Sequence, residues 1–240
     1  MIIGLSLVST AAGPAASAAA TNDYSFELTS TYGDQEKFSF SVAEAGCVIA
    51  QVKSWSRSGT SGLATSQLAL ILNGSDRTSY YAREDGGYTS NAPLWISYAV
   101  SSTQVSKVQT WTISVANFTQ SGTAKGTLNL EYPPTQTPCE LKVAVSRTKG
   151  QVDLGWVYAG RPFRGSFLIE RSTDGRKWRV VTACTKFAPT SSVTTPKKYS
   201  CSDTRLTSGR TYYYRACAIT SGTSCDTQKN ITPPRAVKVP

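Results

Sequence analysis

The sequence has 240 residues, of which 40% are hydrophobic and 17% are charged, and it contains six cysteines and no histidine. This length allows one large domain, or two of about 100 to 120 residues that each close a core without a metal. Without histidine the chain lacks the usual general base, the usual partner of a serine or cysteine nucleophile and a common zinc ligand. Because the carboxylates are also few and scattered, we expect no enzyme, no cofactor and no metal site.

The formal net charge of +10 is concentrated in the second half of the chain. Residues 21–135 carry seven basic and nine acidic side chains, a net charge of −2, whereas residues 136–240 carry eighteen and six, a net charge of +12. This asymmetry points to a basic domain that contacts a polyanion, or to a dipolar molecule that docks against something acidic.

Residues 1–20 contain a short apolar run followed by Ala- and Ser-rich sequence, which is typical of a secretory signal peptide with a small-residue cleavage site. No lysine or arginine precedes the apolar run, so either the true start lies upstream of Met1 or the segment is a disordered Ala-rich tail. No other stretch reaches transmembrane length. We expect a protein that is secreted or held at the cell surface and is not transmembrane.

Alternating apolar and polar residues predict an all-β first domain over residues 21–132. Strands are expected at 38–42, 47–52, 68–72, 94–100, 111–115 and 128–132, which suits an antiparallel sandwich of jelly-roll type. Hairpin turns are expected at Asn73-Gly74 and at Asp85-Gly86-Gly87, where glycine supplies positive φ. The segments FSFSVAEAG, LALILNG and TWTISVANF resemble the bacterial pre-peptidase C-terminal type of β-sandwich.

A candidate ligand site lies between residues 80 and 88 of this domain. Aromatic faces stack on sugar rings, while carboxylates accept hydroxyl protons or ligate calcium. The candidate residues are Tyr80, Tyr81, Glu84, Asp85 and Tyr88. The alternative is a solvated hairpin tip whose tyrosines lean on the sheet.

Three prolines make residues 133–138 a short, semi-stiff linker to a second domain at 139–232. That domain contains the strand segment Leu154-Gly155-Trp156, the hairpin ERSTDG and the pattern L-x-x-G-x-x-YYYR before the penultimate strand. These features resemble a fibronectin type III domain over roughly residues 138 to 232. The resemblance implies that Trp156 is the core tryptophan and that the hydroxyl of Tyr212 bonds to the backbone upstream. Further prolines make residues 233–240 a C-terminal tail.

Six cysteines behind an export signal predict disulfides. Because there is no C-x-x-C spacing and no histidine, we expect structural disulfides and not a metal or redox site. Cys217 is expected to pair with Cys225, and Cys184 with Cys201. Cys47 and Cys139 then either join the two domains, or Cys47 is a buried free thiol.

The basic residues of the second domain include Arg171, Arg176, Lys177, Arg179 and Arg215, which are candidate ligand-binding residues. We expect an exported binding or adhesion protein that attaches to polysaccharide, cell envelope or extracellular matrix through a scaffold of two tandem β-sandwiches. The alternative is a structural subunit or spacer that contacts surface proteins. Specific nucleic-acid recognition is not expected, because most tyrosines and tryptophans have core roles.

Overall fold

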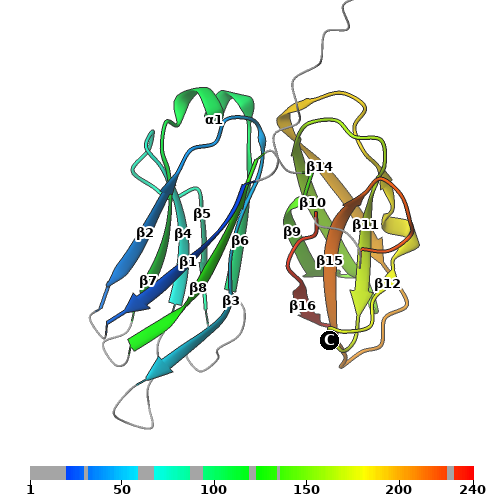
Figure 1. The fold of residues 1–240 in the computed structure, drawn as a ribbon. Helices are drawn as coiled ribbons and strands as arrows, with labels where there is room; N and C mark the ends of the chain where they lie inside the picture. The colour runs from blue at the N-terminus through cyan, green and yellow to red at the C-terminus, as the bar shows by residue number, and fades with distance from the viewer. Residues whose placement is uncertain are drawn as a thin grey trace, which may run out of the picture.

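The computed structural model describes residues 20–29, 32–58, 68–86, 94–118, 123–133, 136–225 and 230–240. The fold is all β and forms two β-sandwiches in tandem (Figure 1). Nearly all of the predicted signal segment, residues 1–19, lies outside the described part of the chain. Within that part no helix is long and apolar enough to cross a membrane.

The first sandwich packs two four-stranded antiparallel sheets, in the orders β1-β8-β3-β6 and β2-β7-β4-β5. Its core holds residues of both sheets, such as Val48 and Trp111. All six predicted strands are present, and β1 and β5 are additional. The elements are β1 (Ala20–Leu28), β2 (Gln35–Phe40), β3 (Gly46–Ser58), β4 (Leu68–Gly74), β5 (Ala82–Asp85), β6 (Leu94–Val100), α1 (Ser102–Lys107), β7 (Trp111–Asn117) and β8 (Thr123–Tyr132).

The two predicted glycine turns of this sandwich are wrong in their backbone reason. Gly74 and Gly86 do not have positive φ, and Gly87 lies outside the described residues. A Cβ at Gly74 would lie 2.7 Å from the Tyr81 ring, so the glycine allows a close approach instead. Asp85 ends β5, and the next described strand, β6, belongs to the other sheet, so β5 and β6 are not paired as a hairpin.

The second sandwich packs the sheet β14-β10-β9 against the sheet β12-β11-β15-β16, with β13 paired to β11. Residues 233–240 are not a tail: β16 pairs with β15 from Thr211↔Lys238 to Tyr214↔Arg235. The preceding prolines lie before the strand, where no ladder hydrogen bond is lost. The elements are β9 (Cys139–Val145), β10 (Val152–Gly160), β11 (Ser166–Ser172), β12 (Arg179–Val180), the 3-10 turn η1 (Thr182–Cys184), β13 (Lys186–Phe187), β14 (Val193–Asp203), β15 (Thr211–Ile219) and β16 (Arg235–Lys238).

Trp156 and Tyr212 lie in the core of the second sandwich. The Trp156 ring is 1% exposed and stacks on Tyr199, with ring centroids 5.5 Å apart. The Tyr212 hydroxyl accepts the backbone N–H of Thr207 at 3.0 Å, the upstream bond that the resemblance implies. Tyr214 and Ala216 share this core face of β15, as alternation requires.

On the opposite face of β15, Arg215 pairs with a buried carboxylate. Its Nη2 and Nε atoms lie 2.6 and 2.8 Å from Oε2 of Glu170, the cross-strand neighbour on β11. The Glu170 side chain is 1% exposed, and its other oxygen accepts the backbone N–H of Cys225 at 2.9 Å. The Arg215 guanidinium also lies 4.2 Å from the Trp178 ring centroid.

The structure contains both predicted disulfides, Cys184–Cys201 and Cys217–Cys225. It also pairs Cys47 of β3 with Cys139 of β9, which decides between the two alternatives for these cysteines. Around this bond Ile49, Ala99 and Val157 form a small apolar cluster between the sandwiches. No cysteine is free.

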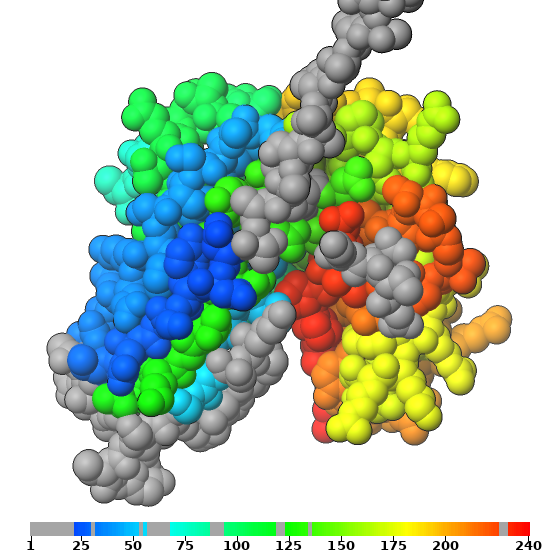
Figure 2. Space-filling view, in the orientation of Figure 1, coloured from blue at the N-terminus to red at the C-terminus, as the bar shows by residue number. Residues whose placement is uncertain are grey.

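Polar contacts complete the joint between the sandwiches. The guanidinium of Arg235 lies 3.9 Å from the ring centroid of Trp95 and 2.8 Å from Oε1 of Glu84. Arg161 pairs with Glu44 at 2.7 Å. In Figure 2 the red C-terminal segment lies at the boundary between the two halves of the molecule. The joint therefore combines a covalent bond, apolar packing and ion pairs.

We predict that Trp156→Ala lowers the free energy of unfolding by about 3 to 5 kcal/mol, because it leaves a large cavity in the second core. Thermal and urea denaturation of the variant measure this loss. Tyr80→Ala, at a side chain that is 52% exposed, should stay within about 0.5 kcal/mol of wild type. A native melting temperature for Trp156→Ala would contradict the packing described.

We predict that Arg215→Gln destabilises the protein by about 3 to 5 kcal/mol, because Glu170 is left buried without its cation. Urea denaturation measures the change. The matched control is Arg210→Gln, which removes one exposed arginine from the same sandwich and should change stability by less than about 0.5 kcal/mol. Equal effects of the two substitutions would show that the buried ion pair contributes nothing.

Candidate functional site

Among the residues that the structure describes, the members of the predicted sugar platform of the first sandwich do not come together in one site. The Tyr81 ring packs 4.9 Å from that of Trp111, and its hydroxyl donates to Asp76 at 2.7 Å. Burial, followed by the Asp76 carboxylate, raises the pKa of the Tyr81 hydroxyl. These contacts correct the prediction for Tyr81, because its ring face and its hydroxyl are already used.

The other members of that predicted set are separated. Glu84 pairs with Arg235 in the joint between the sandwiches, and Asp85 pairs with Arg83. Tyr80 is exposed, and Tyr88 lies outside the described residues. The packed Tyr81 and the exposed Tyr80 match the alternative of a solvated tip with a tyrosine that leans on the sheet, although Glu84 and Asp85 lie on the strand β5.

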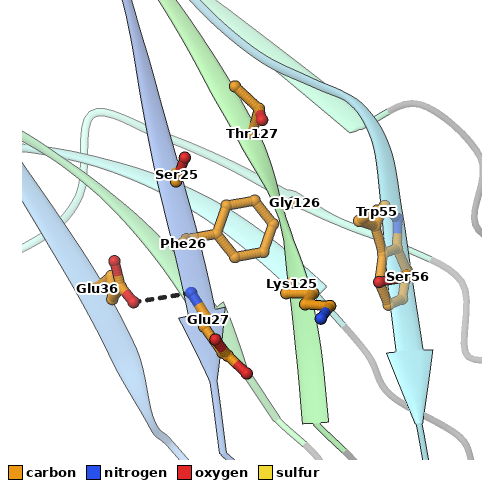
Figure 3. Close-up of a pocket in the computed structure, with 9 residues that line it drawn as sticks. All are labelled: Ser25, Phe26, Glu27, Glu36, Trp55, Ser56, Lys125, Gly126 and Thr127. Atoms are coloured by element: carbon orange, nitrogen blue, oxygen red, sulfur yellow. Dashed lines mark hydrogen bonds between the residues drawn. The ribbon is translucent and has the colours of Figure 1, made fainter.

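A hollow of about 710 Å³ lies on the first sandwich, over β1, β8 and β3 (Figure 3). Gly126 lies between Phe26 and Trp55 in the sheet register, and Oε1 of Glu36 accepts the backbone N–H of Glu27 at 2.8 Å. Phe26 and Trp55 are 3% and 6% exposed, so neither offers a ring face for stacking. The hollow is lined by Ser25, Phe26, Glu27, Glu36, Trp55, Ser56, Lys125, Gly126 and Thr127.

The second sandwich holds a cavity of about 430 Å³ that we call the basic pocket. Three segments build it: the end of β11 with the turn that follows, β12, and the loop that joins β14 to the start of β15. These segments meet at one end of the sandwich. The lining residues are Arg171, Ser172, Thr173, Asp174, Lys177, Arg179, Arg205, Thr207, Arg210 and Tyr212.

Some of the predicted basic residues form ion pairs that stabilise the fold, and others line the basic pocket. Arg215 is held by Glu170, and Arg171 donates from Nη1 to both oxygens of Asp203 at 2.8 and 3.0 Å, so both partly serve the fold. Arg176 is exposed and does not line the pocket. Lys177 and Arg179 line it. The prediction of a ligand-binding role is therefore corrected for Arg215, whose charge is neutralised by a buried carboxylate.

Both carboxylates near the pocket are engaged by the protein. Backbone N–H groups of Lys177 and Arg176, together with the Ser172 hydroxyl, hold the pKa of Asp174 at about 2. Asp203 accepts hydrogen bonds from Arg171 and from the hydroxyl of Tyr214 at 2.9 Å. Each negative charge is thus satisfied within the fold.

Four cations of the pocket have no such partner. Among the described residues, no ion pair joins Lys177, Arg179, Arg205 or Arg210 to a carboxylate. Burial acts to raise the pKa of Tyr212, but the hydrogen bonds from Thr207 and the charges of Arg210 and Arg171 outweigh it, so this pKa is lowered. The pocket therefore carries an excess of positive charge, although the charge of Lys177 also helps to lower the pKa of Asp174.

Two features of the pocket lower the stability of the fold. Arg205 has φ of 61°, in the left-handed region that arginine seldom adopts. Arg171 and Arg179 lie directly opposite each other on β11 and β12, an arrangement of like charges that destabilises a strand pair.

Arg205 and Arg210 belong to the pocket but were not among the predicted ligand residues. They follow Arg179 by more than two dozen residues. In the sequence they stand out only as members of the large set of basic residues in the second half. Their proximity to Lys177 and Arg179 depends on which loops meet at this end of the sandwich.

No family model and no curated protein matches this sequence. Among solved structures, the chain is similar to a β-1,2-glucanase from Parabacteroides distasonis, with 15% identity over 91% of this chain and 32% of that chain and a TM-score of 0.27. It is similar to a Lactobacillus rhamnosus β-glucuronidase, with 9% identity over 87% of this chain and 36% of that chain and a TM-score of 0.28. It is also similar to the glycoside hydrolase domain of Endo-D from Streptococcus pneumoniae R6, with 13% identity over 91% of this chain and 36% of that chain and a TM-score of 0.22. The chain spans about a third of the length of these proteins.

These matches correct the expectation that the protein is not an enzyme, because the matching chains are glycosidases. Glycosidases act through paired carboxylates and need no histidine. The lack of histidine in this chain therefore does not exclude catalysis. At TM-scores of 0.22 to 0.28 the matches assign no activity to it either.

Proposed function

We propose that the protein is an exported binding or adhesion protein whose second sandwich attaches to an anionic polymer, such as an acidic polysaccharide of the cell envelope or extracellular matrix. The observation that carries this proposal is the basic pocket, where four cations lack carboxylate partners in a half of the chain with net charge +12. Cations that face a polyanion displace its counterions, which favours binding at low salt.

Export is supported by the cysteines. All six are paired in disulfides, which form and persist in oxidising compartments and are rare in the cytosol. Together with the signal-like sequence of residues 1–20, the disulfides favour a secreted or surface-held protein.

We further propose that the second sandwich is of the fibronectin type III kind. The buried Trp156 and the bond from the Thr207 backbone to the Tyr212 hydroxyl support this assignment. Such sandwiches host many functions, so the assignment gives the scaffold and not the ligand.

A second candidate function is a structural subunit or spacer of an extracellular assembly. The joint between the sandwiches favours it, because a disulfide and the ion pairs of Arg235 and Arg161 hold the two halves together. Under this alternative the two-domain unit contacts other surface proteins.

We predict that the full chain is retained on a heparin column above physiological salt, and that Arg205→Asn/Arg210→Gln elutes at markedly lower salt. The slope of log affinity against log salt should fall by about one for each cation removed. The control is Lys186→Gln/Lys198→Gln, with the same change in net charge. Lys186 pairs with Phe167, at the opposite end of β11 from Arg171.

Wild-type elution below physiological salt, or equal losses in both double variants, would show that the positive charge is only a solubilising surface. The spacer alternative would then be preferred. Self-association measured by light scattering would support that alternative directly.

A further inference from the structure

We propose that the basic pocket is a subsite for one compact tetrahedral oxyanion, a phosphate or sulfate ester group, which Arg179, Arg205 and Arg210 contact. This inference rests on the proposed attachment to an anionic polymer and names the chemical group of that polymer that the pocket binds. The cavity of about 430 Å³ is of the size that accommodates a small ligand.

The placement of the cations favours a tetrahedral group over a carboxylate. Arg179 comes from β12, Arg205 from the loop after β14, and Arg210 from the residue before β15. An ester phosphate or sulfate presents three oxygens in different directions, so guanidinium groups from separate segments can each donate to it. A carboxylate presents two oxygens in one plane and matches a single guanidinium.

A hydroxyl and a lysine complete the pocket. The Tyr212 hydroxyl accepts the Thr207 backbone N–H, which leaves its own proton for donation. Lys177 adds a positive charge from the turn after β11. The backbone N–H groups of Arg176 and Lys177 each donate to Asp174 at 2.8 Å, which fixes the conformation of this turn. The donors therefore come from a turn and strand ends that the fold already holds in place.

The two costs of the pocket point to the same role. An asparagine at position 205 would adopt the left-handed backbone more readily than arginine, and an uncharged side chain at 179 would remove the repulsion opposite Arg171. Strained backbone clusters at functional sites, where the side chain is needed in that position. An anion bound between these cations would offset both costs.

The test measures binding of methyl phosphate, methyl sulfate and glucuronate to the full chain by calorimetry and thermal shift, with sodium chloride matching the ionic strength. We expect at least one of the two esters to bind and to raise Tm more than chloride does, and glucuronate to bind at least fivefold more weakly. The two ester arms separate a phosphorylated polymer from a sulfated one.

Arg205→Asn is the decisive variant, because stability and binding should move in opposite directions. Without ligand its Tm should equal or exceed that of wild type, while its ester affinity should fall at least tenfold. Arg179→Thr should behave in the same way. The control Lys198→Gln, an exposed cation on β14 outside the pocket, should keep wild-type ester affinity.

The proposal is overturned if neither ester exceeds chloride at matched ionic strength, or if Arg205→Asn and Lys198→Gln bind the ester equally well. The heparin column separates this failure from that of the proposed function. Retention that is lost only in the pocket variants, without ester binding, would leave polymer attachment standing and remove the tetrahedral subsite. If the wild-type protein shows neither heparin retention nor ester binding, both polymer attachment and the tetrahedral subsite are ruled out.

Discussion

The Cys47–Cys139 disulfide and the apolar cluster around it determine how the two halves of the molecule relate. Strands β3 and β6 are buried on both faces, because Val48 and Ile96 face the first core while Ile49 and Trp95 face the second sandwich. Closing a loop of 92 residues contributes about 4 to 5 kcal/mol in the chain-entropy view. The linker prolines therefore join two bodies that are already held side by side, and any ligand on the second sandwich meets a fixed neighbour.

The positive charge of the second half has two distinct uses. Arg215 and Arg171 neutralise the buried carboxylates Glu170 and Asp203, and removing either partner would leave a costly buried charge. Lys177, Arg179, Arg205 and Arg210 of the basic pocket form no ion pair with a carboxylate among the described residues. Net charge alone thus overstates the binding capacity of the domain, and the informative quantity is the number of cations without a protein partner.

Sequence periodicity predicted strands well where one face meets a core, as at Leu70 and Leu72, because alternation directly reports burial. It missed β1, whose sequence ATNDYSFEL is polar except for Ala20 and three large apolar side chains, and β16, whose four residues follow two prolines. The site was harder to predict because it depends on register and loop placement. No local pattern indicates that Arg215 lies opposite Glu170, because that pairing is set by the register of β11 and β15.

The disulfide between the sandwiches also sets how the molecule carries tension. A pulling force applied between residues 20 and 240 passes along the chain to Cys47, crosses to Cys139 and bypasses residues 48–138. If the first sandwich unravelled under such a force, only residues 20–47 would extend, by about 95 Å at 3.5 Å per residue, instead of more than 400 Å for the whole segment. If the protein attaches to a surface as proposed, the bond would act as a short tether that limits the extension of the chain.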